Sequence, residues 1–145
     1  MPSLSKNHSS LLVKPALILA LALSGVLLHA RVATERANVT KGTWGGEHAI
    51  LEVSDKGAEI EFDCAHGQIT QPITLNKHGD FDVTGTFTPE HGGPVRRDEN
   101  TPPASARYSG HIEGNTMILR VALEKENLGT YELTRGAQPM LRKCR

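Results

Sequence analysis

Apolar and polar residues alternate along most of the chain after position 40, and no stretch there repeats its apolar residues at helical spacing. The clearest segment is 58–64, which places its apolar residues on one face and three carboxylates on the other. The two faces consist of Ala58, Ile60, Phe62 and Cys64, and of Glu59, Glu61 and Asp63. Because a shift of one residue would bury the three carboxylates, this alternation determines which face points inward.

The alternation predicts about seven strands, separated by turns rich in Gly, Asp and Asn. They cover residues 48–54, 58–64, 73–76, 80–88, 107–113, 117–123 and 129–136, and His66–Gly67 interrupts the pattern. Each strand has one polar face and most links are short, which is typical of an antiparallel up-and-down meander of seven to eight strands. A meander leaves exposed edges unless it closes, so we expect an all-β fold that forms a small barrel, with a two-sheet sandwich as the alternative.

The N-terminus differs from the rest of the chain, and its composition predicts a signal helix. Thirteen apolar or small residues, from Ala16 to Leu28, follow a polar segment that contains Lys6 and Lys14. A run of this length is shorter than the ~20 residues that cross a bilayer, and it is typical of the apolar part of a secretory signal. We therefore expect a signal peptide at residues 1–30 and a secreted or periplasmic protein. The alternative is an uncleaved helix that anchors the protein in the membrane.

Removal of residues 1–30 determines the expected domain organisation and net charge. A polar lead-in at 31–40 and a single β domain at 41–145, with a long loop at 89–105, remain. Lys plus Arg falls from 16 to 14 because Lys6 and Lys14 are lost, while Asp plus Glu stays at 16, so the net charge becomes −2. The sequence has neither a basic excess nor a basic run, which argues against nucleic acid as a partner.

Two cysteines, Cys64 and Cys144, lie in the predicted β domain. In an exported protein, a pair of cysteines predicts one disulfide. This bond would close a loop of about 80 residues and stabilise the fold by ~4 kcal/mol in the chain-entropy model, which matters for a domain with a small core. The alternative is a free and reactive Cys64.

The single tryptophan, Trp44, lies among Gly42, Gly45 and Gly46 at the entrance to the first predicted strand. Glycine tolerates sharp backbone bends, so this setting suits a large side chain that plugs one end of a barrel. Gly42-Thr43-Trp44 resembles the Gly-x-Trp element of the calycins, the group that includes lipocalins and avidins. The resemblance implies a barrel whose base is plugged by the tryptophan and which binds small apolar ligands inside.

The inward rows of the predicted strands combine large apolar side chains with small residues such as Gly85, Gly110 and Gly129. The small residues either allow tight curvature in a filled barrel or leave a cavity for a ligand. We predict non-catalytic binding of a small apolar ligand by inward-facing residues. The alternative is that the same residues only form the hydrophobic core. The candidate ligand-lining residues are Trp44, Phe62, Phe81, Phe87, Tyr108, Met117 and Tyr131.

The loop at 89–105 is longer than most connections in compact domains, and such loops are commonly functional. Four prolines restrict its conformations, and Arg96 and Arg97, followed by two acidic residues, give it a charged tip. We predict contacts with a partner through His91, Arg96 and Arg97. The second functional hypothesis is therefore a protein of the cell envelope that binds or inhibits another protein through this loop.

A metal-binding protein or an enzyme is the third hypothesis. Five histidines follow position 40, but the sequence has no His-x-His or His-x-x-His pair, and a metal site needs three or four converging ligands. Ser109 lacks the first glycine of the Gly-x-Ser-x-Gly setting of a hydrolase nucleophile. We therefore predict no catalytic residue, no metal site and no cofactor.

Overall fold

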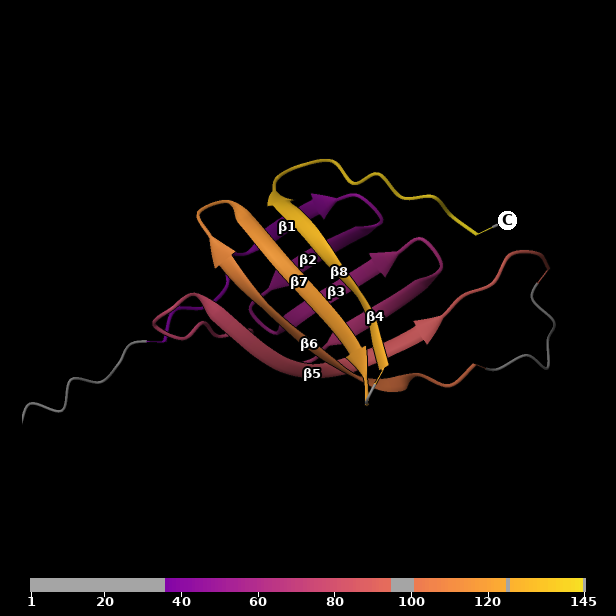
Figure 1. Cartoon of the computed structure of the whole chain (residues 1–145), viewed down its shortest axis with the longest axis horizontal. Helices are drawn as coiled ribbons and strands as arrows, with labels where there is room; N and C mark the ends of the chain where they lie inside the picture. Colours follow the sequence, from indigo (N-terminus) through magenta and orange to yellow (C-terminus); the bar gives the residue numbers. More distant parts are fainter. Residues whose placement is uncertain (1–35, 95–100, 125, 145) are drawn as a thin grey trace, which may run out of the picture. The chain divides into compact units, whose positions relative to one another are not determined.

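The computed structural model describes residues 36–94, 101–124 and 126–144. These residues form eight strands, each antiparallel to the next, and β8 pairs with β1 to close a barrel (Figure 1). The strands are β1 (Gly42–Gly46), β2 (Ala49–Ser54), β3 (Gly57–Phe62), β4 (Ala65–Ile69), β5 (Asp80–Pro89), β6 (Ala104–Glu113), β7 (Thr116–Leu123) and β8 (Glu126–Arg135). The predicted all-β antiparallel barrel is confirmed, and the sandwich is not formed. The predicted signal peptide at 1–30 lies outside the described residues.

One strand of the barrel lies where the sequence predicts a break. Residues 65–69 form β4, and Gly67 in its centre lies opposite Ile60 of β3 and Phe87 of β5. The predicted interruption at His66–Gly67 is therefore wrong. Glycine weakens a strand by itself, but here two neighbouring strands and the packing described below hold it in the sheet.

The predicted strand at 73–76 is also wrong, because this segment closes one end of the barrel instead. Thr74 makes a single bridge to Asn38, and Val39 N donates to Ile73 O over 2.9 Å. Val39 and Ile73 are both buried. We call this end, where β1 and β5 begin, the base of the barrel.

Alternation along the strands separates an apolar interior from a polar exterior, as predicted for 58–64. Ala58, Ile60 and Phe62 are buried, while Glu59 and Glu61 are exposed. Every buried residue among those described belongs to the apolar class. The two outward carboxylates fix the register of β3, since a shift of one residue would bury both of them.

Trp44 lies inside the barrel and is fixed by a contact with the chain that precedes β1. Its side chain is 1% exposed, and Nε1 donates to the carbonyl oxygen of Thr40 over 3.0 Å. The glycines that follow Trp44 permit close backbone approach. A Cβ on Gly45 would lie 2.2 Å from the carbonyl oxygen of Ala137, and a Cβ on Gly46 would be equally close to a carbonyl oxygen of β8. Any larger residue at these two positions would push the neighbouring segments away.

Two wall glycines make room for Tyr108 of β6. A Cβ on Gly67 would lie 2.1 Å from the Tyr108 hydroxyl oxygen, and a Cβ on Gly85 would lie 2.9 Å from its ring. The hydroxyl donates to the carbonyl oxygen of Thr86 over 2.6 Å, and burial raises the pKa of Tyr108 above its ordinary range. The buried hydroxyl is thus neutral and hydrogen-bonded, as a buried polar group requires.

Phe81 of β5 fills the space beside Gly110 in the same way. A Cβ on Gly110 would lie 2.1 Å from the carbonyl oxygen of Ile118 and 2.8 Å from the Phe81 ring. At these positions the volume that small residues leave free is occupied by aromatic side chains of the protein itself. The sequence left open whether the inward glycines belong to a filled barrel or to a ligand cavity. Near Tyr108 and Phe81 the barrel is filled.

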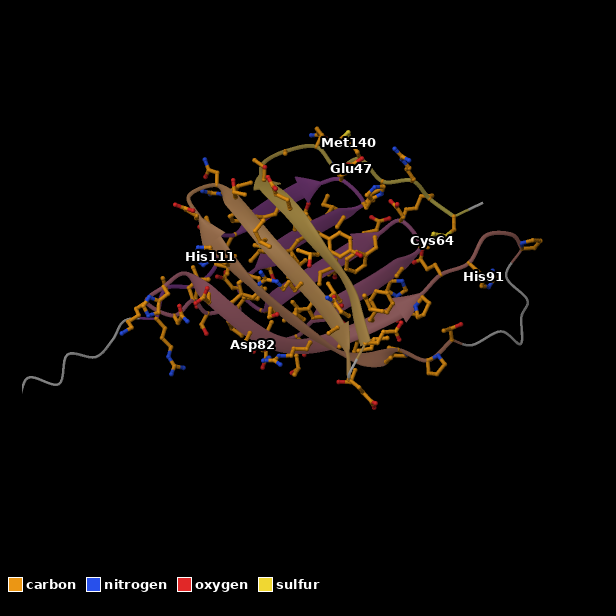
Figure 2. The ribbon with its side chains drawn as sticks, in the orientation of Figure 1. Glu47, Cys64, Asp82, His91, His111 and Met140 are labelled. Carbon is orange, nitrogen blue, oxygen red and sulfur yellow. A yellow bond between two sulfur atoms is a disulfide. The ribbon has the colours of Figure 1, made fainter. Side chains whose placement is uncertain are left out.

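The C-terminal tail is fastened to the outside of the barrel. β3 ends at Phe62, so Cys64 lies exposed in the turn before β4 rather than in the predicted inward row. It forms the predicted disulfide with Cys144, and the two Cα atoms are 5.3 Å apart (Figure 2). In the same turn, Asp63 Oδ1 accepts a hydrogen bond from Arg142 N over 2.6 Å.

Replacement of both cysteines by alanine should lower the free energy of unfolding by about 4 kcal/mol, because Cys64 and Cys144 are 80 residues apart in the chain. Urea unfolding followed by Trp44 fluorescence measures the change, and reduced wild-type protein should lose a similar amount. A loss below about 1 kcal/mol would contradict stabilisation by loop closure.

Gly67→Ala should lower the free energy of unfolding by about 2 kcal/mol, because the new methyl group overpacks against the Tyr108 hydroxyl. Tyr108→Phe should cost about 1 kcal/mol by removing the hydrogen bond to Thr86. In the double variant the alanine should cost less than it does alone, since the closer of the two oxygens that it would contact, that of Tyr108, is absent and only the Thr86 carbonyl oxygen remains. Strictly additive costs in the same unfolding assay would show that this contact is not the reason for the glycine.

Candidate functional site

Three aromatic side chains meet at the end of the barrel opposite the base. We call this the loop end, because the connection from β5 to β6 leaves the barrel there. The centroid of the Phe62 ring lies 5.6 Å from that of Phe87 and 5.0 Å from that of Tyr131. Phe62 is buried, whereas Phe87 and Tyr131 are half-buried. These three residues, the aromatic cluster, bring part of the apolar interior into reach of solvent.

Two half-buried leucines belong to the same end of the barrel. Leu123 ends β7, and Leu128 lies in a bulge of β8, where the ladder to β7 shifts between Val121 and Ala122. Burial, together with the negative charge of Asp63, raises the pKa of Tyr131, so its hydroxyl is protonated at neutral pH. The loop end therefore offers apolar surface together with one neutral hydroxyl group.

The structure divides the seven predicted ligand-lining residues into two groups. Phe62, Phe87 and Tyr131 form the aromatic cluster at the loop end. The other four are buried in the core and are Trp44, Phe81, Tyr108 and Met117. Those four residues form the hydrophobic core and have little contact with solvent. The aromatic cluster, in contrast, reaches the surface and can contact a ligand there.

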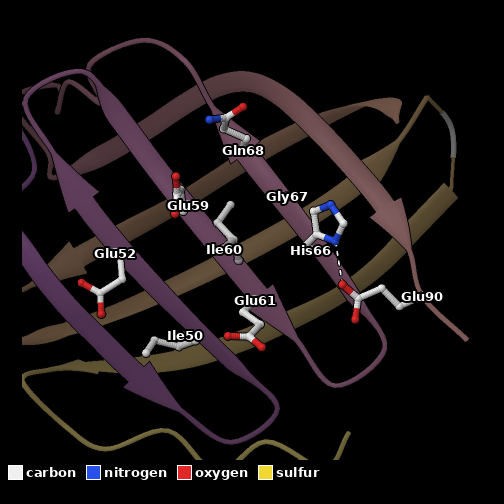
Figure 3. Close-up of a pocket in the computed structure, with 9 residues that line it drawn as sticks. All are labelled: Ile50, Glu52, Glu59, Ile60, Glu61, His66, Gly67, Gln68 and Glu90. Carbon is white, nitrogen blue, oxygen red and sulfur yellow. Dashed lines mark hydrogen bonds and ion pairs between the residues drawn. The ribbon is translucent and has the colours of Figure 1, made fainter. Parts of the chain in front are cut away.

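A second candidate site lies on the outer wall of the barrel, over β2, β3 and β4. It is a hollow of about 590 Å³ that we call the outer groove (Figure 3). Its volume is within the usual range of ligand pockets, but most of its side chains are exposed and polar. The lining residues are Ile50, Glu52, Glu59, Ile60, Glu61, His66, Gly67, Gln68 and Glu90.

Two carboxylates of the outer groove have cationic or hydrogen-bonding partners. Glu61 forms an ion pair with Lys143 of the C-terminal tail. Glu90 Oε1 lies 2.7 Å from His66 Nδ1, and this contact links the residue after β5 to β4 (Figure 3). Sequence analysis did not identify the pair, because the ladder between β4 and β5 that brings the two residues together has no local signal.

The other two carboxylates of the groove belong to residues at paired positions of neighbouring strands (Figure 3). Glu52 of β2 lies directly opposite Glu59 of β3, and neither has an ion-pair partner among the described residues. Like charges in this position are unfavourable. The signal for the pair is present in the sequence: the tight turn that brings Ser54 opposite Gly57 fixes the register of the two strands.

Histidine–carboxylate pairs also occur at both ends of the barrel. His48 Nδ1 lies 2.6 Å from Asp63 Oδ2, and His111 Nδ1 lies 2.8 Å from Asp80 Oδ1. The hydrogen bond from the backbone N–H of Arg142 lowers the pKa of Asp63, and the hydrogen bond to His48 lowers it to a smaller extent. The hydrogen bond to His111 lowers the pKa of Asp80. Within the described residues, no group of three or more His, Cys, Asp or Glu could hold a metal ion.

The predicted partner-contact residues follow β5. His91 is exposed, and its Nδ1 lies 3.0 Å from the carbonyl oxygen of Gly92 (Figure 2). Arg96 and Arg97 lie outside the described residues. The start of this connection is fixed to the barrel, because Glu90 N donates to the carbonyl oxygen of Cys64 over 2.8 Å.

Comparisons with known proteins gave no match: no family model, no curated protein and no solved structure is significantly similar to the chain. The residues that the structure describes contain no helix long and apolar enough to cross a membrane. Inferences about function therefore depend on the geometry given above.

Glu59→Gln should raise the free energy of unfolding by about 0.5 kcal/mol, because it removes the like charge opposite Glu52. Urea unfolding at low and high salt measures this change, and the gain should shrink at high salt as exposed charges are screened. Glu61→Gln is the matched control, since it removes a carboxylate of the same strand that has a cationic partner. Equal effects of the two substitutions would exclude repulsion between Glu52 and Glu59.

Proposed function

We propose that this protein is a non-catalytic binding domain that accepts an apolar group at the loop end of its barrel. The observation that carries the proposal is the aromatic cluster. Phe62, Phe87 and Tyr131 are in ring contact, and two of them are half-exposed. Apolar surface that reaches solvent at the end of a barrel is available for a ligand without unfolding of the core.

The packing of the interior supports a site at the rim in preference to one deep inside. Tyr108 occupies the space beside Gly67 and Gly85, and Phe81 occupies the space beside Gly110. A ligand in the centre would have to displace these side chains, and Tyr108 would lose its hydrogen bond to Thr86. A ligand over the aromatic cluster leaves these core side chains and this hydrogen bond in place.

The proposed setting is the periplasm or the extracellular medium. Two observations support it: the apolar run after Lys14 in the sequence, and the disulfide between Cys64 and Cys144, a bond that persists mainly in oxidising compartments. An uncleaved N-terminal anchor is the alternative. Likeness to the calycins remains part of the proposal, and the buried Trp44, hydrogen-bonded to Thr40, supports it.

A second candidate function is the binding of an envelope protein through residues 89–105. One observation favours it. Glu90 is held to β4 by His66 and by the backbone of Cys64, so the start of this connection is fixed beside the barrel. This anchoring supports the proposal because a segment that follows Glu90 leaves the barrel from a fixed point.

The neutral dye N-phenyl-1-naphthylamine should bind to the protein and become more fluorescent. Tyr131→Ala should weaken binding about tenfold, because burial of an aromatic ring contributes ~1.5 kcal/mol or more. Ile112→Ala, which shortens a half-buried apolar residue of β6 at the base, is the matched control and should change the affinity less than about twofold. Absence of saturable binding by the wild-type protein, or equal losses in the two variants, would exclude a site at the aromatic cluster.

A further inference from the structure

The three rings of the aromatic cluster come from strands that are not neighbours in the barrel. Phe62 belongs to β3, Phe87 to β5 and Tyr131 to β8, and no two of these strands pair with each other (Figure 1). Phe87 and Tyr131 each contact Phe62, with ring planes tilted by 51° and 47°. Tilted rings leave more of their faces uncovered than stacked rings do. The three rings therefore converge from separate parts of the wall and offer π faces at the loop end.

A hollow adjoins the aromatic cluster, between the start of β6 and the turn from β7 to β8. Its volume is about 410 Å³, within the usual range of small-molecule sites. Ala104, one of its lining residues, lies directly opposite Phe87 in the ladder between β5 and β6, so the hollow and the cluster are neighbours. We call it the loop-end hollow. Its lining consists of Ala104, Ser105, Leu123, Glu124 and Glu126.

The loop-end hollow combines apolar surface with negative charge. Leu123 is half-buried against the core. Glu124 and Glu126 are exposed and have no cationic partner in the described part of the chain. On the other side of the cluster, burial and then the charge of Asp63 raise the pKa of Tyr131, which places this carboxylate within electrostatic range of the rings. Carboxylates therefore border the aromatic cluster on two sides.

Negative charge also characterises the other connections at the loop end. Counted from the sequence with histidine neutral, the turns 47–48 and 63–64 each carry a net charge of −1, from Glu47 and Asp63. Residues 90–103 contain two arginines and three acidic residues, so their net charge is 2 − 3 = −1. Residues 124–126 contain one lysine and two glutamates and sum to 1 − 2 = −1. Every connection at this end therefore favours a positively charged ligand.

The basic residues of the C-terminal tail lie beside a different part of the loop end. The backbone N–H of Arg142 is bound by Asp63, and Lys143 pairs with Glu61, both near the turn between β3 and β4. In the order of strands around the closed barrel, this turn is opposite the turn between β7 and β8. Exposed charges on opposite sides of a barrel are screened from each other by salt, so the tail does not neutralise the loop-end hollow.

The groups present at the loop end favour a cation without N–H groups. A primary ammonium carries three donors, is strongly hydrated, and loses free energy on binding unless each donor finds an acceptor. Both oxygens of Asp63 are already engaged, by the backbone N–H of Arg142 and by His48. An alkylated ammonium instead presents apolar surface to the rings and to Leu123, while its charge interacts with the π faces.

We propose that the loop end of the barrel binds a small organic cation in which an alkylated ammonium group is attached to an apolar group. The apolar group lies on the aromatic cluster, and the cationic head lies between Phe87 and the carboxylates of Glu124 and Glu126. The inference rests on the proposed function, because the site is the same and the charge of the ligand is what is added.

The test uses the full chain and isothermal titration calorimetry with two ligands of the same shape, the para-trimethylammonio and para-tert-butyl derivatives of benzyl alcohol. They differ in one atom, a positively charged nitrogen in place of a carbon. The cation should bind about fivefold more tightly than the neutral compound. Addition of salt should weaken binding of the cation and leave the neutral compound unchanged, because screening acts on charge alone.

Three variants locate the bound cation. Glu124→Gln combined with Glu126→Gln should weaken the cation about threefold and leave the neutral compound unchanged. Glu52→Gln combined with Glu59→Gln removes the same charge from the outer groove. It is the matched control and should change the affinity for the cation less than about 1.5-fold. Phe87→Leu keeps an apolar side chain but removes the π face, so it should weaken the cation about threefold and the neutral compound less.

The outcomes separate this inference from the function on which it rests. If the neutral compound binds as tightly as the cation, the choice of a cation is overturned and the apolar site stands. The same conclusion follows if the control variant weakens the cation as much as the hollow variant does, or if Phe87→Leu affects both compounds equally. If neither compound nor the naphthylamine dye binds, the proposed function itself fails. A preference for the cation that is lost on substitution at the hollow, and kept on substitution at the groove, would confirm the ligand class.

Discussion

The barrel is closed by a short ladder between its first and last strands, and the rest of the structure depends on the register of that ladder. Three residue pairs, from Trp44 with Arg135 to Gly46 with Leu133, join β1 to β8. The register places Trp44 inside and sets the two bare backbones of Gly45 and Gly46 against neighbouring carbonyl groups. Because β1 has five residues and β8 has ten, this ladder joins only the end of β8 to β1.

The interior is filled through a match between glycines in the wall and aromatic rings inside it. Gly67 and Gly85 accommodate Tyr108, and its hydroxyl is satisfied by Thr86. The match explains how a small barrel holds several large rings while each buried side-chain N or O atom in the described part of the chain has a hydrogen-bond partner. At the loop end the packing is less complete. Phe62 is the one ring that contacts Tyr131 among the described residues, and Tyr131 remains half-buried.

The C-terminal tail has two effects on the barrel: its disulfide stabilises the fold, and its charged and polar groups compensate carboxylates on the outer wall. The disulfide holds the tail beside the turn between β3 and β4, where Lys143 compensates Glu61 and the backbone of Arg142 stabilises the ionised form of Asp63. Glu52 and Glu59, which lie beyond the reach of these groups, repel each other in an exposed position. High solvent exposure keeps the cost of such a pair low.

The sequence by itself determined the all-β class and the inward and outward faces of strands such as β3, because both depend on local alternation. The choice of a closed barrel over a sandwich, and of a disulfide over a free Cys64, was an expectation that the tertiary structure decided. Tertiary structure alone decided which segments pair. It placed residues 65–69 in the sheet and 73–76 outside it. Gly67 leaves room for the hydroxyl group of Tyr108, which comes from a distant strand, and no local pattern reveals that contact. It also separated Tyr131 at the loop end from Trp44 in the core, because register between distant strands, and not residue type, sets the depth of a side chain in a barrel.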